Sequence, residues 1–318
     1  MRPDRLRVRR TNCFILRLCG WAVLLFVLGS EAQSSPAVAA APDEPWPVTL
    51  RQQMARVASI GYRLDRAAVG ICPKQASTIG VAIDDLGAYE QSDRSAISQL
   101  LGMGEDPQIA VVVKGGPADI AGVHAGDALV SIDGRAVRDI IASSPDKALI
   151  ADELEQRLAQ FPAAAPLMLG LRRDGRDLQT QVRPERTCAA RFVIKTGQGI
   201  TAFSDGNNVA ISSRLIDFTI NDDELALVAG HELGHVAYQD GTAPNIAERR
   251  RMEDRADALG LQLATCAGFD PEIGLQFWLR RDKQDMLRLL RDPTHRSRKA
   301  RVELMKAEIP KVHCPVRF

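Results

Sequence analysis

The feature that most constrains this chain is the segment ALVAGHELGHVAYQDG, residues 226–241, which places an acid between two histidines. His231 and His235 are four residues apart, so on a helix both imidazoles project from one face and can converge on one ion. Glu232 lies beside them, where its carboxylate can hold a water molecule instead of the metal. The alternative is a helix whose two histidines are satisfied by ordinary hydrogen bonds. The spacing favours half of a metal site.

The other half of such a site must come from elsewhere, because catalytic zinc takes three protein ligands and keeps a fourth position open. No histidine follows His235 at the metzincin spacing, so we expect a carboxylate on the following helix. In MEDRADALG, Glu253 and Asp257 are one turn apart and share a face. We predict that Glu253 binds zinc and that Asp257 accepts a hydrogen bond from Nδ1 of a ligand histidine. Asp254, about 100° around the helix, is the competing candidate for the ligand.

The N-terminus is typical of an exported protein. A basic stretch, MRPDRLRVRR, precedes an apolar run at residues 18–29, which is shorter than the about 20 residues of a transmembrane helix. We predict a signal peptide at residues 1–32, cleaved after Ala32 or alternatively after Ala39, and a linker at 33–46. The chain would then be periplasmic or otherwise exported, with no later membrane span. The alternative is an uncleaved N-terminal anchor.

Charge and cysteine content narrow the classes further. The 41 basic and 40 acidic residues leave a net charge of +1, so neither a nucleic-acid partner nor a membrane surface is indicated. After removal of the signal peptide, four cysteines remain, which in an oxidising compartment predict two disulfides with three alternative pairings. They are Cys72, Cys188, Cys266 and Cys314.

Residues 76–186 alternate short strands and turns, with hairpin signals at Asp133–Gly134 and Asp174–Gly175. Through GGPADIAGVHAGDALVSIDG and LGLRRDGRDLQTQV, the stretch resembles a PDZ domain of the bacterial type found in exported proteases. The resemblance implies that a peptide adds as a strand beside Val81–Ile83, its carboxylate held by the loop Ile79, Gly80 and Val81. The alternative is a small β-domain without a groove. The segment 87–107 is expected to be a helical insertion that narrows or covers the groove.

The remaining parts, residues 47–72 and 188–318, read as helices with a short β-region. The segments DDELALVAGHELGHV, MEDRADALGLQLATCAGFDP and DPTHRSRKARV resemble the gluzincin metallopeptidase family that includes HtpX, BepA, Oma-type and CAAX prenyl endopeptidases. The resemblance implies one Zn²⁺ per chain, held by His231, His235 and Glu253. It also implies that Glu232 is the general base and that Asp257 supports a ligand histidine. His295 would be a hydrogen-bond donor to the transition state, and Arg301 would orient His295 or hold its helix. The family has Thr-His-Pro where this chain has Thr294–His295–Arg296.

Taken with the resemblance, the chain is expected to be α+β, a mainly helical zincin-type domain interrupted by a PDZ-like β-rich domain. Cys72 and Cys188 flank that insertion, so by position a bridge between them would clamp its stem, and Cys266–Cys314 would tie a helix to the C-terminal tail. The strand at 208–212 resembles the edge strand that pairs with substrate, or else is an ordinary covered edge.

The predicted function is an exported zinc endopeptidase that hydrolyses polypeptide substrates such as unfolded or misassembled envelope proteins, with the PDZ-like domain tethering or gating them. The alternative is a peptide-binding chaperone or adaptor with a non-catalytic zinc site.

Overall fold

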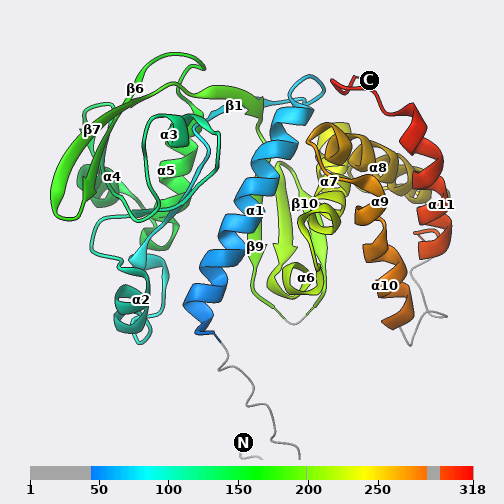
Figure 1. Ribbon diagram of the computed structural model, residues 1–318, viewed down its shortest axis with the longest axis horizontal. Helices are drawn as coiled ribbons and strands as arrows, with labels where there is room; N and C mark the ends of the chain where they lie inside the picture. Colours follow the sequence, from blue (N-terminus) through cyan, green and yellow to red (C-terminus); the bar gives the residue numbers. More distant parts are fainter. Residues whose placement is uncertain (1–43, 198, 285–293, 318) are drawn as a thin grey trace, which may run out of the picture. The chain divides into compact units, whose positions relative to one another are not determined.

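The computed structural model describes residues 44–197, 199–284 and 294–317 (Figure 1). The predicted signal peptide, both cleavage sites and all but the last three residues of the predicted linker lie outside these ranges. Within them, no helix combines the length and the apolar character that crossing a bilayer requires. Helices and largely antiparallel sheets make the fold α+β, as predicted.

The inserted domain is built on one antiparallel sheet with the strand order β2-β3-β4-β6-β7, and the short β5 pairs with β4. Its strands are β2 (Val81–Asp84), β3 (Gln108–Val112), β4 (Ala128–Ile132), β5 (Arg135–Ala136), β6 (Leu167–Arg173) and β7 (Arg176–Val182). The predicted Asp-Gly turns join β4 to β5 and β6 to β7, where Asp133 and Asp174 both have positive φ. Its helices are α2 (Arg94–Leu101), α3 (Pro117–Ile120), α4 (Val137–Ser143) and α5 (Ile150–Ala159).

A two-stranded ribbon forms the stem of the insertion. In it, β1 (Gln75–Thr78) pairs antiparallel with β8 (Glu185–Cys188). The bridge Cys72–Cys188 joins the chain just outside this ribbon, with Cα atoms 5.4 Å apart. The second bridge, Cys266–Cys314, has a Cα separation of 5.5 Å. Both pairings are those expected from position in the chain.

The rest of the described chain is mainly helical. Its elements are α1 (Trp46–Ala68), β9 (Arg191–Lys195), β10 (Ala202–Asp205), β11 (Asn208–Ser212), α6 (Ser213–Phe218), α7 (Asp222–Tyr238), α8 (Ile246–Cys266), α9 (Pro271–Gly274), α10 (Gln276–Gln284) and α11 (Arg298–Glu308). The two long central helices begin at asparagine caps: Asn221 accepts from the Glu224 N–H, and Asn245 accepts from the Glu248 N–H, each at 2.9 Å. The two parts of the fold have separate apolar cores.

The strand predicted at a sheet edge is not at an edge. β11 is the central strand of a three-stranded sheet, paired antiparallel with β10 and parallel with β9. The tight turn at Gly206 brings β10 back along β11, and β9 occupies the other side. The outer strands of this sheet are therefore β10 and β9.

Close backbone contact sets how α7 and α8 cross (Figure 1). A Cβ atom added at Gly260 of α8 would lie 2.5 Å from the backbone nitrogen of His231, and one added at Gly230 would lie 2.7 Å from the carbonyl oxygen of Gly260. Only glycine allows the helices to approach so closely. The crossing lies next to His231, so it also fixes the distance between the histidine helix and the helix that carries Glu253.

Candidate metal centre

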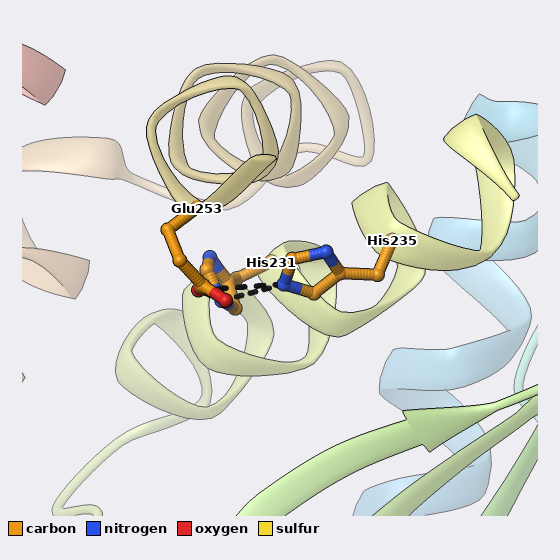
Figure 2. A group of neighbouring side chains, drawn as sticks. All are labelled: His231, His235 and Glu253. Atoms are coloured by element: carbon orange, nitrogen blue, oxygen red, sulfur yellow. Dashed lines mark hydrogen bonds and ion pairs between the residues drawn. The ribbon is translucent and has the colours of Figure 1, made fainter. Parts of the chain in front are cut away.

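Three predicted ligands meet where α7 and α8 face each other (Figure 2). His231 and His235 extend from α7, and Glu253 reaches them from α8. The His231 Nε2 and His235 Nε2 atoms are 3.2 Å apart, and the Glu253 Oε2 atom lies 3.2 Å from the first and 3.5 Å from the second. All three residues are buried.

This arrangement fits a cation better than it fits hydrogen bonds among the three groups. Glu253 is buried. Its Oε1 atom pairs with Arg249 Nη2 at 2.8 Å, and its Oε2 atom faces the imidazoles. Two bonds of about 2.0–2.1 Å meeting at a tetrahedral angle separate their nitrogen atoms by roughly 3.3–3.4 Å. The observed separations of 3.2–3.5 Å agree with that value. The donor set, two imidazoles and one carboxylate, is one that zinc accepts while keeping a fourth position open.

Each histidine is held from behind by its own carboxylate. Asp257 Oδ1 lies 2.9 Å from His231 Nδ1, and Asp240 Oδ2 lies 2.8 Å from His235 Nδ1. These contacts keep the proton on Nδ1 and turn both Nε2 atoms toward Glu253. The carboxylate of Asp257 was expected from the sequence, whereas that of Asp240 was not.

Asp240 was missed because its position depends on how α7 ends. Gln239 takes a left-handed conformation with φ 53°, and the Asp240 N–H donates to the carbonyl of His235 at 3.0 Å. This turn brings the Asp240 carboxylate back to the ring of His235. The signal available in the sequence was an acid directly after the end of the histidine helix.

Two arginines neutralise the supporting carboxylates, Arg301 from a buried position and Arg255 from a partly exposed one. Arg301 donates from Nε to Asp257 Oδ2 at 2.7 Å and stacks 3.8 Å from the centre of the Trp278 ring, while Arg255 pairs with Asp240. Burial alone would raise the pKa of Asp257, but the charge of Arg301 and the hydrogen bonds from His231 and Arg301 together outweigh it and lower that pKa to about 2. Because Arg301 is itself buried against Asp257, it lies behind the metal ligands, and its position is that of a positioning residue.

The same contacts decide the protonation of the ligand group. Burial lowers the pKa of His231, but hydrogen bonding to Asp257 and Glu253 outweighs it and raises that pKa to about 9. Burial raises the pKa of Glu253, and the opposing hydrogen bonds to His231, His235 and His295 lower it far below its usual range. The group is therefore organised around an ionised Glu253.

The structure places Glu253, and not Asp254, beside the two histidines. Asp254 points to a different partner: Arg296 donates to it from Nε and Nη2 at 2.7 and 2.8 Å. Arg296 is the residue that departs from the Thr-His-Pro pattern. In place of the proline, this chain has a two-point ion pair that ties the His295 segment to α8.

His295 lies at the open side of the ligand group. Its Nε2 atom is 2.9 Å from Glu253 Oε2, its Nδ1 atom is 3.0 Å from Thr294 Oγ1, and its side chain is 35% exposed. Glu232, which follows His231 on α7, is 9% exposed. The structure therefore brings His231, His235, Glu253, Asp257 and His295 together at the crossing of α7 and α8, with Arg301 behind Asp257.

The predicted peptide-binding loop of the inserted domain is a separate feature. Ile79 and Gly80 connect β1 to β2, and Val81 is the first residue of β2. All three line a cavity of about 1080 Å³. Gly80 has a φ of +73°, a conformation that other residues rarely adopt. Among the described residues that line this cavity, none comes from the segment 87–107. The expectation that this insertion covers the groove is therefore wrong, since α1 and β9 form the facing wall instead.

Comparison with protein families gives two matches. The model of peptidase family M48 matches residues 178–247, and that of the PDZ domain matches residues 108–144. The predicted resemblance to M48-type gluzincins with a PDZ-like insertion is thereby confirmed. The M48 match ends before Glu253, so that ligand rests on the geometry given above.

Comparison with curated proteins gives no match. Among solved structures, the HtrA-type protease AlgW with a decapeptide is 18% identical over 35% of this chain and 30% of that chain, with a TM-score of 0.27. The HtrA3 PDZ domain bound to a phage-derived ligand is 20% identical over 36% of this chain and 88% of that chain, with a TM-score of 0.25. A serine endoprotease from Yersinia pestis is 21% identical over 26% and 27% of the two chains, with a TM-score of 0.21. The chain thus spans about 30% of the length of AlgW.

Proposed function

We propose that this chain, in which a metallopeptidase domain of family M48 holds a PDZ domain, is an exported zinc endopeptidase that cleaves polypeptides of the cell envelope. The observation that carries the proposal is the buried group of His231, His235 and Glu253 with Glu232 beside it. The M48 match supports the peptidase chemistry, and the PDZ match supports a polypeptide ligand. The basic and apolar leader in the sequence supports export.

In this proposal, zinc held by His231, His235 and Glu253 supplies Lewis-acid polarisation of the scissile carbonyl and a more acidic water. Glu232 accepts the proton of the attacking water on its carboxylate and returns it to the leaving amine. His295 donates from Nε2 to the oxygen on which negative charge develops. Asp257 and Asp240 hold the two imidazoles in the tautomer that leaves Nε2 free to bind.

An extended substrate needs a backbone partner near the ligand group. Because β11 is central, we assign that role to the outer edge of β10 (Ala202–Asp205), which packs near α7. Phe203 of β10 is 39% exposed and offers an apolar contact for a substrate side chain. Pairing along β10 would add a strand to the sheet, as in other β-augmented complexes.

A peptide-binding adaptor that keeps zinc only for structure is the alternative. It is disfavoured because a structural site is closed by four protein ligands, whereas the group that could hold a metal among the described residues consists of three. A structural site also has no use for the acid at Glu232. The adaptor proposal predicts zinc binding without hydrolysis.

The test compares wild type with Glu232→Gln for zinc content and for cleavage of an unfolded protein such as reduced casein. We expect both proteins to bind one zinc per chain and only wild type to cleave. Glu248→Gln is the matched control, because it removes an acid from the exposed start of α8. A Glu232→Gln protein that cleaves at the wild-type rate refutes the mechanism. A zinc-loaded wild type that cleaves no unfolded or envelope protein favours the adaptor.

Export and substrate class need a separate measurement. We expect the protein to be recovered from the periplasmic fraction with its N-terminus after Ala32, and misassembled envelope proteins to accumulate in cells that produce only the Glu232→Gln form. Recovery from the cytoplasm with the leader intact contradicts the localisation without affecting the chemistry.

A further inference from the structure

The cavity beside the PDZ loop has walls from two parts of the chain. One side is formed by β2 and α5 of the inserted domain, and the other by α1 and β9. The sheet order leaves one edge of β2 unpaired among the described strands, because β3 is its only neighbour. That edge faces α5, so the space between them is where an added strand would lie.

One backbone group on this edge is already bound by a side chain. The Ile83 N–H donates to Glu155 Oε1 of α5 at 2.8 Å. The Gly80 carbonyl, in contrast, accepts from the Val113 N–H on the β3 side. Since backbone groups alternate along a strand, Val81 and Ile83 direct theirs toward the groove. A peptide that adds beside β2 therefore has to replace Glu155 as the acceptor for Ile83.

When a peptide replaces it at Ile83, the Glu155 carboxylate stays largely buried and loses a hydrogen-bond donor. The residue is only partly exposed, and burial raises the pKa of Glu155 to about 7, against the smaller opposing effects of the Ile83 hydrogen bond and of Arg191. Arg191 of β9 is also paired with Asp152, one turn earlier on α5. The remaining charged residues of the cavity wall are Lys74 and Asp65, for which no contact with Glu155 is present. The displaced carboxylate thus needs a donor that the ligand brings.

We propose that Glu155 determines which peptides the groove accepts, and that it selects an extended peptide with lysine or arginine beside Ile83. Such a ligand gives Ile83 a backbone carbonyl and gives Glu155 a charge-assisted hydrogen bond, which is roughly twice as strong as a neutral one. An acidic ligand residue at this place would meet Glu155 with like charge. The proposal rests on the proposed peptide-binding role of the PDZ domain, and it is independent of whether the metal centre cleaves.

The position of the basic residue follows from the register. If the carboxylate of the ligand is held by the Ile79–Gly80–Val81 loop, its last residue lies beside Val81. In an antiparallel strand, the residue that lies beside Ile83 is then the third from the C-terminus. The selected class is therefore peptides with a free carboxylate and a basic residue third from the end.

The test measures binding of fluorescent peptides to the full chain carrying Glu232→Gln, so that no peptide is consumed. The peptides are identical except for lysine, glutamine or glutamate at the third position from the C-terminus, and a second set moves the lysine one position either way. We expect the lysine peptide to bind about tenfold more tightly than the glutamate peptide. The preference should weaken when the lysine is moved.

Two variants at Glu155 separate its charge from its hydrogen bond. Glu155→Gln keeps an acceptor for the Ile83 N–H and removes the charge, so the ratio of the lysine and glutamate affinities should fall to about two or less. Glu155→Ala removes the acceptor as well, so the glutamine peptide should bind it about threefold more tightly than it binds wild type. Glu153→Gln is the matched control, because Glu153 lies on α5 and pairs with Arg157 outside the groove.

Several results of these binding measurements would contradict the proposal. An unchanged lysine preference in Glu155→Gln, a wild type that does not distinguish lysine from glutamate, or a loss of preference in the Glu153→Gln control each overturns the proposal. So does an absence of binding by all peptides of the set. Because the readout is affinity in a form without the general base, these failures are distinguishable from a failure of the proposed peptidase activity.

Discussion

Replacing Gly260 with alanine tests whether the close crossing of α7 and α8 builds the metal site. The new Cβ atom would lie 2.5 Å from the backbone nitrogen of His231 and 2.7 Å from the backbone carbon of Gly230, where ordinary contact begins at 3.4 Å. These neighbours are helix backbone, so one helix must move by about 0.9 Å relative to the other. Metal–ligand distances tolerate only about 0.2 Å. The shift is therefore large enough to misplace Glu253 relative to His231.

The expected magnitudes follow from this displacement. Overpacking of a well-packed contact costs about 1–3 kcal/mol, and the gain in helix propensity from glycine to alanine offsets about 1 kcal/mol of it. We expect the free energy of unfolding of the metal-free protein to fall by at most about 2 kcal/mol. Zinc affinity should fall at least tenfold, roughly the effect of losing a supporting contact of a ligand.

Urea unfolding of the metal-free protein and zinc competition with a chromophoric chelator measure the two quantities separately. Gly104→Ala is the control, because a Cβ atom there meets nothing within 4 Å. If Gly260→Ala binds zinc as tightly as wild type does, the helix crossing does not determine the site, and the argument from backbone contact is wrong.

Four further predictions follow from particular contacts. Asp240→Asn should lower zinc affinity about 10–100-fold with little loss of secondary structure by circular dichroism, because His235 loses the carboxylate that fixes its tautomer; an affinity equal to that of wild type contradicts the role of Asp240. Arg296→Ala should reduce the rate of cleavage while zinc content stays at one per chain, because the His295 segment loses its two-point attachment to Asp254; loss of zinc instead would place Arg296 among the supports of the metal. Removal of the Cys72–Cys188 bridge should destabilise the protein more than removal of the Cys266–Cys314 bridge, since the bridges close loops of 116 and 48 residues. The loop-entropy treatment gives a difference of about 0.8 kcal/mol. Urea unfolding of the two double serine variants measures it, and the reverse order would refute the loop argument. Finally, burial raises the pKa of Glu155 from 4.5 to about 7, so the folded chain binds more protons than the unfolded chain between these values, and stability falls as pH rises through that window. Relative to Glu155→Gln, wild type should lose about 2 kcal/mol between pH 4 and pH 8 after allowance for solvent screening at this partly exposed group; parallel stability curves for the two proteins would show that the carboxylate titrates normally.

Local patterns were sufficient where one helix carries the information. The i, i+4 spacing placed His231 and His235 on one face of a helix. The choice between Glu253 and Asp254 was different, because it depends on the rotation of α8 about its own axis. That rotation is set by the contact between Gly260 and Gly230, which links residues 30 positions apart and has no local signature. The prediction of Glu253 therefore relied on the face that it shares with Asp257, and the family resemblance agreed with it.

Parallel pairing accounts for the error at β11. The turn after β10 predicts an antiparallel hairpin, and from that turn alone β11 has one free side. The other side is taken by β9, whose residues from Arg191 to Lys195 pair in parallel with those from Asn208 to Ser212. A parallel partner reaches its place through a connection that no short turn motif announces. The sequence therefore identified the strand but not its position in the sheet.

The orientation of the inserted domain had no signal in the sequence, and it bears most on how the two domains work together. The cavity wall facing the PDZ loop belongs to α1 and β9, and Arg191 at the start of β9 pairs with Asp152 on α5. β9 is in turn the parallel partner of β11, which pairs with β10. A peptide in the groove would thus contact the sheet whose far strand is proposed to hold the substrate. A ligand that lies between the two domains can bias their arrangement only through a difference in its contacts between two states. The Arg191–Asp152 pair is the contact best placed to differ, since an occupant of the groove lies against both residues. A shared wall of this kind is needed if the PDZ ligand gates the peptidase, whereas a simple tether does not need it.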